Sequence, residues 1–195
     1  MCMQKHLIVA AGETEGGDVL SSVEVMNTDT LEWYTAASLP EPVYLMSATV
    51  CGGRLYLLGA WGKNGNPTHA VFTCTLESLI RSYHPPSQTP PHTSEASVWQ
   101  RVADVPVVGS VCVTLNGKVL SISGRGSDGN PTAEVHMYNA KSDLWSLVGR
   151  MPTLRSDCLV LALHNRVIAV GGSTESGISS TVELGGKGAK FHLLS

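Results

Sequence analysis

Two turn-rich segments contain the residue types best suited to contact a binding partner. They share one phrase, Asn64-Gly-Asn-Pro-Thr68 and Asp128-Gly-Asn-Pro-Thr132, the second lying 64 residues after the first. Asn-Gly or Asp-Gly followed by Asn-Pro is turn chemistry, so the phrase is first of all structural. Tryptophan and arginine, however, are enriched in interface hot spots, because they bury a large area and make several polar contacts. The candidate binding residues beside these turns are Trp61, Lys63, His69, Arg125 and Asp128.

The sequence offers little support for catalysis. It contains 7 histidines, but no Gly-x-Ser-x-Gly phrase frames a nucleophile, and no group of His, Cys, Asp and Glu has metal-ligand spacing. We therefore expect no catalytic residue, no metal and no cofactor. An enzyme remains the less favoured alternative.

The 5 cysteines show no Cys-x-x-Cys spacing. Cys51, Cys112 and Cys158 lie in apolar runs, where cysteine behaves as a small buried hydrophobe, and a redox role for one of them is the alternative. An odd number of cysteines without a signal region favours a reducing compartment. We expect a cytoplasmic protein, with the nucleus as the other possibility.

Composition excludes two kinds of partner from our expectations. The net charge is −3 and no run of Lys and Arg occurs, so nucleic acid is not an expected partner. The most apolar run, Val105–Leu115, is too short to span a bilayer, so a membrane is not expected either. Only 15% of the residues are charged, which suits strands that are buried on both faces.

A repeat along the whole chain determines which elements position these residues. An apolar run that ends in small residues recurs at Gly12, Ala60, Gly124 and Gly172, and an aromatic residue follows roughly twenty positions later in three of the four units. One interval is long because of a Pro-, Ser- and Thr-rich insertion at 76–98. Without it the period is about 46–48 residues. Such a unit buries its apolar face only by stacking on its neighbours.

Each unit contains four short apolar runs, which predict four strands. Turn residues separate them, for example Asn116-Gly117, a hairpin signal because both residues accept positive φ. Four short strands at even spacing are typical of a β-propeller blade. In the third unit the four runs are Val111–Leu115, Val119–Ile122, Ala133–Tyr138 and Leu144–Val148.

The pattern resembles the kelch repeat, with a strand ending in a Gly doublet, a Val-Glu-Val-Tyr-Asp-like strand, and a Trp strand followed by Met-Pro. Met-Pro or its equivalent occurs as Leu39-Pro40, Val105-Pro106 and Met151-Pro152, and the Tyr position holds Met26, Cys74, Tyr138 and Leu184. The resemblance implies that the repeat positions hold blades together. These structural positions are Gly12, Trp33, Gly59, Trp99, Gly124, Tyr138, Trp145, Gly171, Gly172 and Phe191.

The predicted fold is all-β, a kelch-type β-propeller of four blades with four antiparallel strands each. The blades of this single domain cover residues 6–40, 44–106, 110–152 and 156–195, and 76–98 forms an insertion loop within the second blade, whose proline-rich stretch could alternatively be a polyproline ligand. The first blade is expected to lack its inner strand, because only six residues precede Leu7. We expect an incomplete ring whose open edges favour self-association; closure by dimerisation is the alternative.

The resemblance also implies a function. Kelch propellers use loops on one face to bind proteins, and Arg155 matches the Arg that often follows Met-Pro, with Tyr44 in the equivalent inter-blade loop. We expect Arg125 and Arg155 to lie on loops, so that their removal leaves stability nearly unchanged. The implied role is substrate recognition, as in BTB-kelch adaptors of cullin-RING ubiquitin ligases. An actin-binding scaffold is the alternative.

Overall fold

The computed structural model describes residues 2–3, 5–59, 61–83, 98–185 and 191–194. Within them the chain forms four four-stranded antiparallel sheets, which we number as blades 1 to 4 in chain order. The strands of blades 1 and 2 are β1 (Cys2–Met3), β2 (His6–Glu13), β3 (Val19–Asn27), β4 (Trp33–Ala36), β6 (Ser47–Cys51), β7 (Arg54–Leu58), β9 (Val71–Thr75) and β10 (Gln100–Val102). Those of blades 3 and 4 are β11 (Val111–Leu115), β12 (Lys118–Ile122), β13 (Thr132–Asn139), β14 (Leu144–Arg155), β15 (Leu159–Leu163), β16 (Arg166–Val170), β19 (Val182–Gly185) and β20 (Phe191–Leu194).

Short elements connect the blades and their inner strands. The β5–β8 ladder joins the segment that enters blade 2 to the loop between the second and third strands of that blade. The β17–β18 ladder closes the corresponding loop of blade 4 on itself. The short elements are β5 (Val43–Tyr44), β8 (Trp61–Gly62), the 3-10 turn η1 (Lys63–Gly65), the helix α1 (Leu76–Arg81), β17 (Ser173–Thr174) and β18 (Gly177–Ile178). The predicted all-β propeller blades are therefore confirmed.

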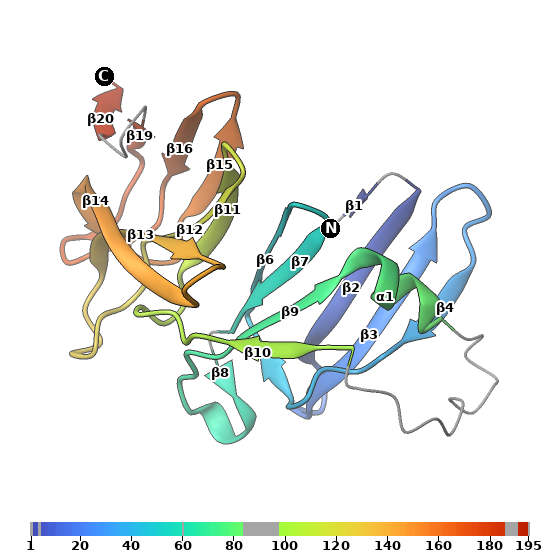
Figure 1. Cartoon of the computed structure of the whole chain (residues 1–195). Helices are drawn as coiled ribbons and strands as arrows, with labels where there is room; N and C mark the ends of the chain where they lie inside the picture. Colours follow the sequence, from blue (N-terminus) through green and yellow to red (C-terminus); the bar gives the residue numbers. More distant parts are fainter. Residues whose placement is uncertain (1, 4, 60, 84–97, 186–190, 195) are drawn as a thin grey trace.

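Three apolar clusters hold the four blades in a row. The first joins blades 1 and 2 around Val25, Leu57 and Trp99, and the second joins blades 2 and 3 around Tyr56 and Tyr138. The third joins blades 3 and 4 around Ile122 and Ala169. Each strand of an inner blade thus contributes alternate residues to the cluster on each side, as period-two alternation requires. Figure 1 shows blade 1 on the right, blade 2 beside it toward the middle, and blades 3 and 4 on the left.

The row of blades is open in the part of the chain that the structure describes. No ladder pairs a strand of blade 1 with a strand of blade 4, and no apolar cluster joins these two blades. The expected incomplete ring is thus what the described residues form. One face of blade 1 and one face of blade 4 carry no neighbouring blade.

Three details of the sequence-based prediction are wrong. Blade 1 does have an inner strand, β1, because Cys2 and Met3 pair with Leu7 and His6 of β2, although β1 has only two residues.

The second correction concerns the insertion, which begins as a helix and not as a loop. In α1 the Thr75 side chain caps Ser78 N, and Leu79 is buried in the cluster between blades 1 and 2, while residues 84–97, which include the proline-rich stretch, lie outside the described residues.

The third correction concerns the Tyr position of blade 4. Tyr138 pairs with Trp145, and Gly185 pairs with Phe191. Gly185 and not Leu184 is therefore the equivalent of Tyr138, because it faces the aromatic position. Leu184 lies one residue earlier and so on the opposite face of the sheet.

Glycine is required where the segment that enters a blade crosses its second strand. A Cβ on Gly124 would lie 2.5 Å from the Val108 carbonyl oxygen, and one on Gly172 would lie 2.5 Å from the Ser156 carbonyl oxygen. Both residues also have positive φ, at 108° and 96°. The predicted structural role of these two repeat positions is thus to let two backbones approach.

Candidate binding face

The long loops of the four blades lie on one side of the molecule, as predicted. In Figure 1 the loop that follows β8 is at the lower side, whereas the short β6–β7 and β15–β16 hairpins point the other way. We call this side the loop face; it comprises residues 13–19, 61–69, 125–132 and 171–181 with the inter-blade segments 41–46, 107–110 and 153–158. Its construction repeats, because Tyr44 pairs with Trp61, Val108 with Arg125 and Ser156 with Ser173. Trp61, Arg125 and Ser173 are therefore equivalent.

Blade 2 contributes an aromatic pair to the loop face. Tyr44 and Trp61 are direct cross-strand partners in the β5–β8 ladder, and both are half-buried. The next residue, Leu45, is 70% exposed and has a φ of 54°. Aromatic pairs held by backbone pairing lose little conformational freedom when a partner covers them, so this cluster is suited to apolar contact.

Blades 3 and 4 contribute a charged pair. The Arg125 guanidinium lies 3.2 Å from the Asp157 carboxylate and donates a second hydrogen bond to the Gly129 carbonyl oxygen. Asp157 also accepts a hydrogen bond from the Ser156 hydroxyl at 2.8 Å. Both charged side chains remain substantially exposed, so the pair adds little to stability but holds a donor and an acceptor at a fixed place.

The remaining predicted residues on the two turns, Lys63 and Asp128, contact other blades in no hydrogen bond or ion pair found among the described residues; those of Asp128 lie within its own turn. The repeated phrase forms the same turn twice, with Gly62 N donating to Asn66 O and Gly126 N donating to Asn130 O. Asp128 accepts hydrogen bonds from the Asn130 backbone and side chain, and these bonds lower the pKa of its carboxyl. Lys63 lies exposed in η1. The structural interpretation of the phrase is therefore confirmed.

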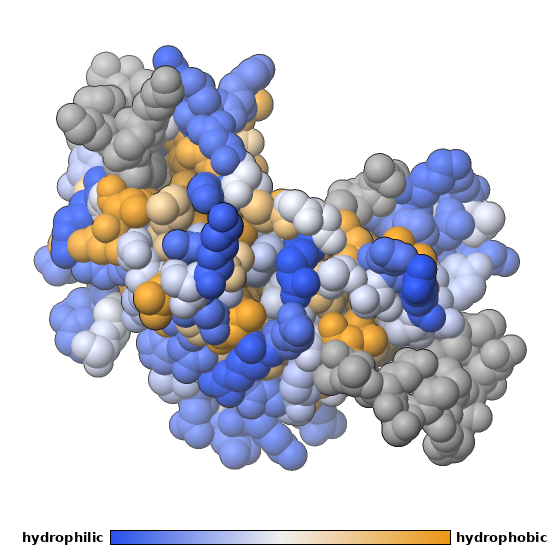
Figure 2. Space-filling view, in the orientation of Figure 1, coloured by the Kyte–Doolittle hydropathy of each residue, from blue (hydrophilic) through white to orange (hydrophobic). Residues whose placement is uncertain are grey.

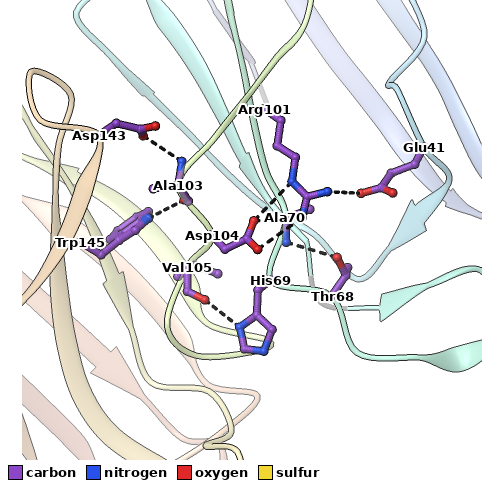
Figure 3. A network of polar contacts seen from close by, with 10 residues as sticks. All are labelled: Glu41, Thr68, His69, Ala70, Arg101, Ala103, Asp104, Val105, Asp143 and Trp145. Carbon is purple, nitrogen blue, oxygen red and sulfur yellow. Dashed lines mark hydrogen bonds and ion pairs between the residues drawn. The ribbon is translucent and has the colours of Figure 1, made fainter.

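His69 contacts the segment that leads out of blade 2 and does not point freely into solvent. Its Nδ1 lies 2.7 Å from the Val105 carbonyl oxygen, and its own carbonyl accepts a hydrogen bond from Val105 N. Figure 3 shows the ring turned toward this carbonyl, beside the segment that leads out of blade 2. The part of His69 still available to a partner is the other edge of its ring.

Arg155 does not lie exposed on a loop, so that prediction is wrong. β14 extends through Arg155, whose side chain is 0% exposed and forms a 2.7 Å ion pair with the equally buried Glu183. Its guanidinium also donates to the Gly171 carbonyl oxygen and the Thr181 hydroxyl. The equivalent positions in the other inter-blade segments, Val43 and Val107, are also buried. The position points between blades whatever residue occupies it.

A hollow on blade 4 was missed by the sequence analysis. It has a volume of about 470 Å³ and lies between Pro152–Leu154 and the β17–β18 hairpin. Its lining is rich in hydroxyl groups, and none of the predicted binding residues reaches it. Single Ser and Thr residues in turns carry no distinctive sequence signal. The lining residues are Pro152, Thr153, Leu154, Thr174, Glu175, Ser176, Ile178, Ser179 and Thr181.

A second missed residue, Asp143, fixes the segment that leaves blade 2. Its carboxylate accepts hydrogen bonds from Ala103 N at 2.8 Å and from the Tyr138 hydroxyl at 2.7 Å, and these bonds lower the pKa of the carboxyl. Trp145 Nε1 donates to the Ala103 carbonyl oxygen in the same network (Figure 3). The network holds the chain where it enters blade 3, and so it positions the loop face indirectly.

The described residues contain no group of three or more His, Cys, Asp and Glu side chains placed to hold a metal ion. No helix in the described part of the chain is long and apolar enough to cross a membrane. Burial raises the pKa of the Cys74 and Cys112 thiols to about 12. Both are therefore protonated at neutral pH and poor nucleophiles, as expected for cysteines that serve as small apolar residues.

Comparison with known proteins finds relatives that contain kelch repeats. No family model matches the chain. The chain is 25% identical to Kelch-like protein 35 of Mus musculus over 174 residues, which cover 89% of this chain and 26% of that protein. It is also 25% identical to Kelch domain-containing protein 8B of Mus musculus over 167 residues, 84% of this chain and 45% of that protein. The relatives of this chain are kelch-repeat proteins. The chain spans less than half of the length of either relative.

A solved structure supports the same architecture for this chain. The structure of YjhT superposes with a TM-score of 0.68 at 17% identity, covering 94% of this chain and 54% of that one. At this identity the likeness concerns the fold alone. The predicted resemblance and the predicted kelch-type propeller fold are therefore both confirmed.

Proposed function

We propose that this kelch-repeat chain is a non-enzymatic protein-binding module that holds its partner on the loop face. The observation that carries the proposal is the repeated pairing of Tyr44 with Trp61 and of Val108 with Arg125. It places an aromatic pair and the Arg125–Asp157 ion pair on elements fixed by backbone hydrogen bonds. Rigid loops with such side chains are typical of sites where proteins bind.

The two clusters suit a peptide or protein loop with mixed chemistry. Tyr44, Leu45 and Trp61 offer apolar and aromatic surface, and Arg125 offers donors to a carboxylate or carbonyl group of a partner. Engaging Arg125 in this way requires only exchange of its exposed contact with Asp157, which costs little in water. Lys63, His69 and Asp128 border these clusters. Arg155 is not among the contact residues, because it is buried.

The finer role we propose is substrate recognition, of the kind found in BTB-kelch adaptors of cullin-RING ubiquitin ligases. In such an adaptor a separate domain contacts the ligase, and this chain would supply recognition only. The second candidate is an actin-binding scaffold. We place either role in the cytoplasm, where free cysteines such as Cys74 and Cys112 would be stable.

The test compares partner capture by matched variants of the chain. Proteins captured from cell extract by the wild type are quantified against capture by Trp61→Ala, Arg125→Ala and, as a control, Lys118→Ala. Lys118 is exposed on the β11–β12 hairpin, away from the loop face. A hot-spot residue contributes about 2 kcal/mol or more, which corresponds to roughly 30-fold weaker binding.

We expect a specific partner to be lost with Trp61→Ala and Arg125→Ala and retained with Lys118→Ala. Equal capture by all four proteins would contradict the proposed use of the loop face. Co-sedimentation with filamentous actin separates the two roles, because only the scaffold candidate pellets with filaments in a Trp61-dependent manner.

A further inference from the structure

The hollow on blade 4 lies on the loop face, at the junction of blades 3 and 4. One wall is Pro152–Leu154 near the end of β14, and the other is the β17–β18 hairpin between the second and third strands of blade 4. Its volume of about 470 Å³ falls in the range of pockets that hold small ligands, about 300–1,000 Å³. The hollow is therefore large enough to take a side chain of a partner.

Backbone hydrogen bonds hold both walls of the hollow in place. Ser156 and Ser173 exchange backbone hydrogen bonds of 2.9 and 2.8 Å, which join the segment that enters blade 4 to β17. Ser179 N donates to the Gly172 carbonyl oxygen at 2.9 Å and fixes the other end of the hairpin. A site whose walls are fixed before binding loses little conformational entropy when a ligand enters it.

The buried Arg155–Glu183 ion pair lies directly behind the lining of the hollow. Thr181 belongs to the lining, and its hydroxyl accepts a 2.9 Å hydrogen bond from the Arg155 guanidinium. The same guanidinium pairs with the Glu183 carboxylate at 2.7 Å, and both charged side chains are 0% exposed. Because these two charges balance each other, the charge that a ligand meets is set by the exposed side chains of the lining.

The lining combines a carboxylate and hydroxyl groups with two exposed apolar side chains. Of the lining residues Glu175 alone is charged; it is exposed, and no ion pair of its carboxylate is found in the described part of the chain. Leu154 is 42% exposed and Ile178 is 95% exposed. An uncompensated carboxylate beside apolar carbon favours a ligand that is apolar along its length and positively charged at its end.

Arginine and lysine are the side chains of this form, and the hydroxyl groups of the hollow favour arginine. The Thr174 and Ser176 hydroxyls, which flank Glu175 in the sequence, lie 3.0 Å apart. Thr174 donates its hydroxyl proton to the Gly177 carbonyl oxygen at 2.8 Å, so its oxygen remains an acceptor for a ligand. A guanidinium carries several donors in a planar fork and can bind a carboxylate and nearby hydroxyl oxygens together, whereas an ammonium is a compact, strongly hydrated charge.

We propose that the hollow is a subsite of the loop face that takes an arginine side chain of the bound partner. The guanidinium lies against Glu175, and the methylene groups lie against Leu154 and Ile178. The inference rests on the proposed function, because it names one residue of the partner that the loop face holds. Figure 2 shows mostly hydrophilic surface along the lower side of the view, where Figure 1 places the loop that follows β8. A face of this kind selects its partner mainly through charge and hydrogen bonds, as an arginine subsite does.

The test uses a small probe, so that it does not depend on the identity of the partner. N-acetylarginine amide is titrated into the isotope-labelled chain, and the backbone amide resonances are followed by NMR. N-acetylcitrulline amide, which has nearly the same shape without the charge, is the matched probe. Glu175→Gln removes the charge of the hollow, and Glu15→Gln, in the corresponding loop of blade 1, is the matched control variant. Both glutamates are exposed turn residues, so both variants should keep the fold.

We expect the arginine probe to shift the amides of Leu154 and Thr174 and to bind Glu175→Gln about fivefold more weakly than the wild type, the loss typical of an exposed ion pair. Glu15→Gln should bind the arginine probe like the wild type, and the citrulline probe should not distinguish Glu175→Gln from the wild type. An arginine probe that shifts no amide of the lining, or that binds Glu175→Gln as well as the wild type, would overturn the inference.

The inference and the proposed function can fail separately. Partner capture by the loop-face variants is measured without the probe, so it can succeed when the hollow binds no arginine. Equal capture by all those variants would contradict the proposed function, and binding of the arginine probe would then still show a site for arginine in the hollow.

Discussion

At the residue scale, the structure separates side chains that bind from side chains that hold blades together. Arg125 and Arg155 are the same residue type, 30 positions apart and both near inter-blade segments. Arg125 shares an exposed ion pair with Asp157, whereas Arg155 is enclosed by blade 4 and paired with Glu183. Residue type and a turn-like sequence context did not distinguish them. The burial of Val43 and Val107, which occupy the position of Arg155 in the other inter-blade segments, does distinguish them.

We expect Arg155→Ala to destabilise the protein by about 3–5 kcal/mol, because Glu183 would remain buried without its partner. Chemical denaturation followed by tryptophan fluorescence measures the effect. Arg125→Ala is the matched control and should change the free energy of unfolding by no more than about 0.5 kcal/mol. The double variant Arg155→Met/Glu183→Leu should recover much of the lost stability. Equal effects of the two single alanine variants would contradict the assigned burial.

We expect His136 to make the stability of blade 3 depend on pH. Burial lowers the pKa of its imidazole below the ordinary value of 6.5; Glu134, 3.5 Å away, partly opposes this shift, and Arg150 adds to it. The folded protein therefore binds fewer protons at this residue than the unfolded chain. The free energy of unfolding should be unaffected above pH 6.5 and fall as the pH drops below it.

The matched variant for this prediction is His136→Phe, because Phe72 occupies the equivalent register position in blade 2. We expect the variant to lose less stability than the wild type between about pH 7.5 and pH 5.5, the range in which an ordinary histidine titrates. The measurement is the urea midpoint at each pH. A wild type and variant with parallel pH profiles would show that His136 does not contribute.

At the element scale, each outer strand reaches back to the preceding blade through its tryptophan. Trp99 is 3% exposed in the cluster between blades 1 and 2, and Trp145 packs against Tyr138 in the next cluster. The spacing of these tryptophans was visible in the sequence, and so was their structural role. Their unequal burial was not visible in the sequence, because the burial of each tryptophan depends on the blade that packs against it.

We expect Trp99→Ala and Trp145→Ala each to cost about 3–5 kcal/mol, because each removes a large aromatic ring and an inter-blade hydrogen bond. Trp33→Ala should cost about 1–2 kcal/mol, since its ring is already partly in water. Urea denaturation of the three variants, all at the same protein concentration, makes the comparison. A loss below about 1 kcal/mol for Trp145→Ala would contradict the assignment of that strand.

At the scale of the whole molecule, the sequence predicted what depends on local periodicity. Two-residue turns such as Asn116-Gly117 and the alternation along each strand specified the blades, and the pairing of Leu115 with Lys118 confirms that hairpin. The errors arose where long-range packing decides. Leu76–Arg81 is helical because Thr75 caps it and Leu79 enters an inter-blade cluster, and Gly185 takes the Tyr position because of its register with Phe191. Composition alone cannot show either contact.

An open row of blades should also be unevenly stable. In repeat architectures stability is approximately the sum of intrinsic terms and interfaces between neighbours, and blades 2 and 3 have two such interfaces whereas blades 1 and 4 have one. Native-state hydrogen exchange should therefore show the slowest amides in β7, β9, β12 and β13, and faster exchange in β2 and β16. Uniform protection of all four blades in a dilute sample would mean that the blades unfold as one unit.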